Sequence, residues 1–143
     1  MRTYYIFFIK NDIYKITKNK TEVLYKLLES IKYLNKNEIN LGFKVFEKLC
    51  DRVPKKNINK LIKDDFIDNL SYNIFKDTHV INDFINNEST KLTVYSSHLV
   101  IKSNALFPEF FNTLSKLNNL FACDFENMDY FYIRNVKIKV SSK

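Results

Sequence analysis

The chain is 143 residues long, and its 45% hydrophobic and 15% aromatic residues are too many for a disordered protein and enough for a core without disulfides or metals. The net charge of +7 leaves nucleic-acid binding open, but the positive charges are mostly single, scattered lysines. Arginine, the forked donor preferred for phosphates and bases, occurs only as Arg2, Arg52 and Arg134, so a solvated basic surface is the simpler interpretation.

The first strand is predicted at residues 3–9, a continuous run of β-branched and aromatic residues. Such a run is typical of a strand that is buried on both faces, so we expect it near the centre of a sheet. No small-residue cleavage site follows this strand, and no apolar run is long enough to span a bilayer, so we predict a cytoplasmic protein with no membrane partner. Residues 11–20 are irregular and are expected to form a loop or a single helical turn.

Two helices are predicted next. Between residues 21 and 34, apolar residues recur at the spacing of one helical face. Asn35, three residues before Glu38, forms a variant of the capping box and opens a second helix that ends at Pro54. The apolar face of this second helix is predicted to comprise Ile39, Phe43, Phe46, Leu49 and Cys50. Because the link is short, the two helices are expected to form an antiparallel αα-hairpin.

The stretch 55–88 has a less regular pattern, from which we expect a short helix followed by turns. A β-hairpin is predicted over residues 92–101, with Ser96, Ser97 and His98 in its turn. Pro108 is well placed in the first turn of a further helix, whose apolar stripe ends at Leu117.

Strands are predicted at 120–123, at 130–133 and at 136–140, where lysines alternate with apolar residues as in an edge strand. Helices and strands therefore alternate irregularly, which indicates the α+β class. We predict a single domain over residues 1–143, in which a mixed β-sheet is packed by the N-terminal αα-hairpin and a C-terminal helix.

Residues suited to catalysis are few. Gly42 is the only glycine, which excludes glycine-rich phosphate loops. His79 and His98 lack a partner at metal-binding spacing, and Cys50 and Cys123 lie in apolar surroundings that favour buried free thiols. We therefore expect no enzyme activity, no metal and no cofactor.

The densest group of carboxylates is Asp124, Glu126 and Asp129, which follows the strand at 120–123. Carboxylates at a strand end are suitable ligands for a metal-dependent nuclease, and aromatic and basic residues near Arg134 suit nucleic-acid binding. Solvated turn residues and an ordinary strand explain the same patterns, so these functions remain alternatives.

An apolar patch is predicted on the second helix. Leu41 and Val45 lie off its core face, four residues apart, so they are neighbours on the helix surface, and Lys44 flanks them. Exposed aliphatic residues with a basic rim suit a protein-binding surface.

The order of these segments resembles that of a known family. Residues 1–10, Met-Arg-Thr-Tyr-Tyr-Ile-Phe-Phe-Ile-Lys, are similar to the start of the SirA family, in which a Tyr-Tyr pair leads an apolar strand. Residues 110–117 and the following strand, which leads into Cys123-Asp124-Phe125, resemble the family's helix and closing strand. The resemblance spans most of the chain apart from its middle.

The resemblance implies inhibition of replication initiation in sporulating cells, through binding to the N-terminal domain of the initiator DnaA and without enzymatic activity. Carried over, the family's apolar contact after the first strand falls on Ile13, and its helix contact falls at or near Val45. Its second aromatic contact falls on Thr17, where this chain lacks an aromatic ring, and Tyr14 could substitute. With Leu41 and Lys44, these residues make up the predicted partner-binding surface. A basic nucleic-acid-binding protein, a metal-dependent nuclease and an adaptor for another protein are the alternatives.

Overall fold

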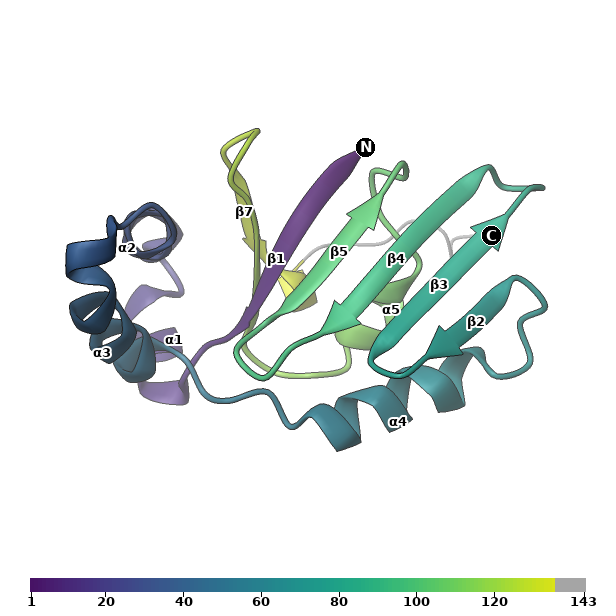
Figure 1. The fold of residues 1–143 in the computed structure, drawn as a ribbon, viewed down its shortest axis with the longest axis horizontal. Coiled ribbons are helices and arrows are strands. Elements are labelled where there is room, and N and C mark those ends of the chain that lie inside the picture. The colour runs from purple at the N-terminus through teal and green to yellow at the C-terminus, as the bar shows by residue number, and fades with distance from the viewer. Residues whose placement is uncertain (136–143) are drawn as a thin grey trace.

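The computed structural model describes residues 1–135, which form one seven-stranded sheet and five α-helices (Figure 1). The strands are β1 (Arg2–Phe8), β2 (Tyr72–Phe75), β3 (Thr78–Asp83), β4 (Glu88–Val94), β5 (Leu99–Ser103), β6 (Leu120–Asp124) and β7 (Asp129–Tyr132). The helices are α1 (Asn11–Thr17), α2 (Thr21–Lys32), α3 (Ile39–Leu49), α4 (Lys55–Phe66) and α5 (Phe110–Leu114), with short 3₁₀ helices η1 (Lys36–Glu38) and η2 (Ile133–Asn135).

The sheet has the strand order β2-β3-β4-β5-β1-β6-β7, and each of its pairings is antiparallel. The α+β class is confirmed, but the predicted mixed sheet is wrong. A parallel pair needs a crossover that returns the chain beside the strand it left. Here the four helices after β1 lead instead to β2 at the far edge of the sheet, and tight hairpins then return the chain strand by strand to β5.

Strand β1 lies between β5 and β6, as its apolar run predicted. Its side chains alternate between the two faces of the sheet. Tyr4 and Ile6 belong to one hydrophobic cluster, whereas Phe7 and the following Ile9 belong to another on the opposite face. The two clusters are called the α4/α5 core and the α2/α3 core below.

In two stretches the structure differs from the sequence-based prediction. Residues 11–17 form helix α1 instead of a loop or a single turn. The turns expected after the helix α4 contain strands β2 and β3, which form a hairpin at the edge of the sheet. The hairpin of β4 and β5 and the strand β6 are confirmed. The strand predicted at 136–140 lies outside the described residues.

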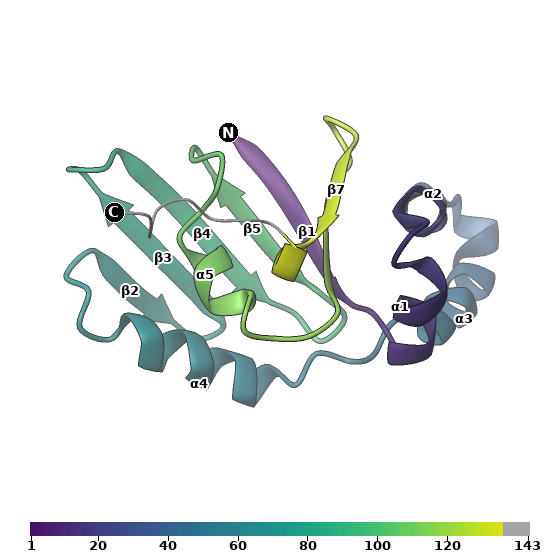
Figure 2. The ribbon, with the colours of Figure 1, turned by 180° about the vertical axis from the view of Figure 1, so that it is seen from behind.

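The α4/α5 core is closed by helices on one face of the sheet. Figure 2, the view from behind, shows α5 in front of the strands and α4 running along their lower ends. Ile62, Phe110 and Phe111 are fully buried and pack with inward-facing residues of β1, β3, β4, β5 and β6. Burial of such large side chains is the main source of stability in a domain of this size.

The α2/α3 core lies on the other face, beside β1, β6 and β7, at the end of the molecule where Figure 1 shows α1, α2 and α3 grouped together. Leu24, Tyr25 and Leu28 supply the buried face of α2. The ring of Tyr25 stacks on Tyr130 with centroids 4.5 Å apart. The helical group therefore covers only one end of this face.

Candidate protein-binding surface

Backbone hydrogen bonds join the start of α1 to the end of α3. The Lys10 N–H donates to the Leu49 carbonyl at 2.9 Å, and the Asp51 N–H donates to the Phe8 carbonyl at 2.7 Å. Ile9 and Cys50 form an isolated antiparallel bridge between these bonds. The segment after β1 and the second early helix, far apart in sequence, are thus held side by side.

Helix α1 is anchored on β7 through Thr17 and Tyr14. The Thr17 hydroxyl donates to the Ile13 carbonyl at 2.8 Å and lies 3.3 Å from the Tyr132 hydroxyl. The ring of Tyr14 meets that of Tyr132 edge to face, with centroids 5.0 Å apart. Thr17 is buried, whereas Ile13 and Tyr14 remain partly exposed at the margin of the α2/α3 core.

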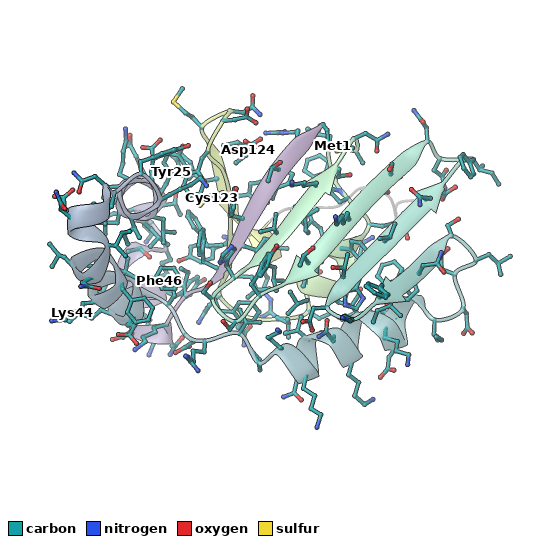
Figure 3. All side chains as sticks on the ribbon, in the orientation of Figure 1. Met1, Tyr25, Lys44, Phe46, Cys123 and Asp124 are labelled. Carbon is teal, nitrogen blue, oxygen red and sulfur yellow. The ribbon has the colours of Figure 1, made fainter. Side chains whose placement is uncertain are left out.

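The predicted residues on α3 lie at its outer surface. Leu41 has 64% of its side chain surface exposed, and Lys44 is also exposed, projecting outward from the helix in Figure 3. Val45 is half-buried and, like Ile13 and Tyr14, packs against the α2/α3 core. Five of the six predicted residues therefore keep some exposure, and Thr17 supports them from beneath.

The predicted core face of α3 is partly wrong, because Ile39 and Phe43 are exposed by 55% and 59%. Leu49 and Cys50 are buried as predicted, and Gly42, which was not predicted to be in the core, is buried on the same side of the helix. A Cβ atom at Gly42 would clash with Leu34 Cδ1, so the missing side chain allows the α2–α3 link to approach the helix. A glycine gives no hydrophobic signal, and the sequence pattern therefore assigned the contact to the wrong flank.

Ile39 and Phe43 form one wall of a groove of about 430 Å³ between α2, α3 and the sheet. Its floor includes the buried rings of Phe7 and Phe125. The full lining comprises Tyr5, Phe7, Leu28, Ile31, Lys32, Leu34, Ile39, Gly42, Phe43, Phe46, Ser97, His98 and Phe125. No local sequence pattern reveals this groove, because its residues come from segments up to 120 positions apart.

Two of the three carboxylates considered as nuclease ligands, Asp124 and Asp129, take part in ion pairs. Arg2 Nε donates to Asp124 at 2.9 Å and Arg2 Nη2 donates to Asp129 at 3.1 Å. Burial raises the pKa of Asp124, but hydrogen bonds from Asn127 and Arg2 outweigh this effect and hold the pKa below its ordinary value. No group of three or more potential metal ligands gathers within residues 1–135.

His79 and the two cysteines are buried inside the fold. His79 is fully buried, with its two ring nitrogens 2.7 Å from the Tyr72 hydroxyl and 2.8 Å from Asn59 Oδ1. Burial lowers the pKa of His79 to about 4, so the ring is neutral at pH 7. Cys50 and Cys123 are buried free thiols, as predicted.

The sequence matches the family model described as "Sporulation inhibitor of replication protein SirA" over residues 2–137. The chain belongs to the SirA family. Membership links this SirA-family chain to inhibition of replication in sporulation, a regulatory role, and agrees with the resemblance found in its opening strand and closing segments. A comparison with curated proteins gave no match. None of the helices within residues 1–135 is long and apolar enough to cross a membrane.

Proposed function

We propose that this chain inhibits replication initiation by binding the N-terminal domain of DnaA through a surface formed by α1 and α3. Membership of the SirA family is the observation that carries the proposal. The contact residues proposed are Ile13, Tyr14, Leu41, Lys44 and Val45, with Thr17 as a buried support.

The exposure of Leu41 supports this surface. An aliphatic side chain that is 64% exposed contributes little to folding and is available to a partner, and the neighbouring Lys44 provides a charged rim. Ile13 and Val45 lie at the margin of one core, so a partner could extend that apolar surface without rearranging the fold.

Tyr14 takes the place of the aromatic contact that is missing at Thr17. Its ring is already fixed against Tyr132, so little side-chain entropy is lost when it contacts a partner. Thr17 keeps α1 in place through its bonds to Ile13 and Tyr132.

Calorimetric titration of the chain with the N-terminal domain of the host's DnaA tests this function. We expect saturable one-to-one binding. Absence of binding at high micromolar concentration would contradict the proposal. A parallel titration with duplex and single-stranded DNA separates it from the nucleic-acid alternative, which requires binding that weakens steeply with salt.

A further inference from the structure

The groove between α2, α3 and the sheet lies on the opposite flank of α3 from Leu41 and Lys44. We propose that it is a binding site for a small amphipathic carboxylate, with an aromatic or branched apolar body in the groove and the carboxylate on Lys32. This inference does not depend on the identity of the protein partner.

The shape and lining of the groove suit a small molecule. Its volume of about 430 Å³ falls in the range of ligand pockets, and most of its lining is aromatic or aliphatic. Phe7, Leu28 and Phe125 are buried beneath it, whereas Ile39 and Phe43 form an exposed wall. An apolar ligand would therefore remove from water a surface that the fold itself leaves uncovered.

One positively charged side chain, that of Lys32, lies at this apolar surface. Among the lining residues Lys32 alone carries a formal charge at pH 7, and its Nζ lies 4.2 Å from the centroid of the Tyr5 ring and 5.8 Å from that of Phe125. Within residues 1–135 no carboxylate lies within ion-pair distance of this ammonium group. Cation–π contacts hold the ammonium over the groove floor, where an anion can reach it.

Two neutral polar residues, Ser97 and His98, also line the groove. Ser97 Oγ lies 2.7 Å from His98 Nδ1, and both residues line the groove. Burial and the nearby Lys32 lower the pKa of His98, so its ring is neutral and adds no second positive charge. A neutral hydroxyl–imidazole pair can orient a bound carboxylate by hydrogen bonding, while one cation supplies its counter-charge.

The probes are 2-naphthylacetate, its uncharged analogue 2-naphthaleneethanol and the cationic 2-(2-naphthyl)ethylamine, each titrated against the full chain and followed by methyl and aromatic NMR shifts. We expect the shifts to cluster on Ile31, Ile39 and Phe43. The acid should bind about fivefold more tightly than the alcohol, because an exposed ion pair contributes at most about that factor, and the amine should bind most weakly.

Variants separate the charge from the apolar contacts. Lys32→Gln should abolish the preference for the acid over the alcohol, and Phe43→Ala should weaken both about fivefold through loss of aromatic contact. Matched changes on the other flank of α3, Lys44→Gln and Leu41→Ala, should leave both affinities unchanged. Shifts that map elsewhere, equal binding of acid and amine, or an acid preference that survives Lys32→Gln would each overturn the proposal.

Discussion

The two faces of the sheet differ in how completely their apolar side chains are covered. On one face, the α4/α5 core is closed: Phe110, Phe111 and Ile62 are fully buried. On the other, the α2/α3 core is flanked by exposed apolar side chains, including Leu41 and Phe43. Both cores bury large side chains and stabilise the fold, but exposed residues beside the second core also form the wall of a groove, so this is the face that we expect to bind.

The largest expected effect contrasts a phenylalanine from each face. Phe110→Ala should lower the free energy of unfolding by about 4 kcal/mol, because Phe110 packs against Phe66 with ring centroids 5.0 Å apart and leaves a cavity when truncated. Phe43→Ala should cost less than about 1 kcal/mol. Urea denaturation measures both values, and equal losses would refute the distinction between the faces.

The next effect concerns how the free energy of unfolding depends on pH through His79, which is buried beside the α4/α5 core. The pKa of His79 is lowered to about 4 from 6.5, so the unfolded chain takes up a proton on this residue before the folded chain does. Stability should therefore fall as the pH drops through this window, by about 2 kcal/mol between pH 7 and pH 5. His79→Gln should flatten this pH dependence in urea titrations, and identical slopes in the two proteins would argue against the buried neutral imidazole.

A comparable loss is expected at the end of the sheet face that carries the α4/α5 core. Arg2→Met removes two charge-assisted bonds and leaves the buried carboxylate of Asp124 without its cation, at a cost of about 2 kcal/mol in unfolding free energy. The matched control is Lys60→Met, which breaks the exposed pair with Asp64 and should cause no measurable loss. If both substitutions had the same effect in urea denaturation, burial of Asp124 would not matter.

The smallest expected effect concerns the cysteines on the face that carries the α2/α3 core. Its rim is exposed, but Cys50 and Cys123 lie inside its core, where burial raises the pKa of Cys50 to about 12 and raises that of Cys123 as well. Iodoacetamide should therefore leave both thiols unmodified at pH 8 in the folded protein and alkylate both in urea, as followed by mass spectrometry. Rapid alkylation under native conditions would show that solvent and reagent reach the inside of this core in the folded protein.

The sequence was most informative where hydrophobic periodicity is strong. The central strand β1 and strand β6 were predicted because their side chains are mostly apolar, and the β4–β5 hairpin was predicted because apolar residues at 92–95 and 99–101 flank a polar turn. Strands β2 and β3 were missed because Asn73, His79 and Asn82 interrupt their apolar residues. The buried position of His79 depends on Tyr72 and Asn59, 7 and 20 residues away, and no local pattern reveals such partners.

The candidate surface was predictable only in part. Leu41 could be placed outside the core by its helical spacing, and it is exposed. The burial of Thr17 depends on Tyr132, which is 115 positions away, and the exposure of Phe43 depends on the close approach of Leu34 to Gly42. Packing between separate elements decides both, so the sequence alone could define neither the support of α1 nor the groove.

Calorimetry with the N-terminal domain of DnaA, applied to two matched variants, tests the proposed α1–α3 surface most directly. Leu41→Glu and Leu106→Glu each place a carboxylate at an exposed leucine, 64% and 58% exposed, on α3 and on the β5–α5 loop. We predict that Leu41→Glu weakens binding at least about tenfold, whereas Leu106→Glu binds like the unaltered chain. Unchanged binding by Leu41→Glu, with both variants folded by circular dichroism, would contradict the proposed surface.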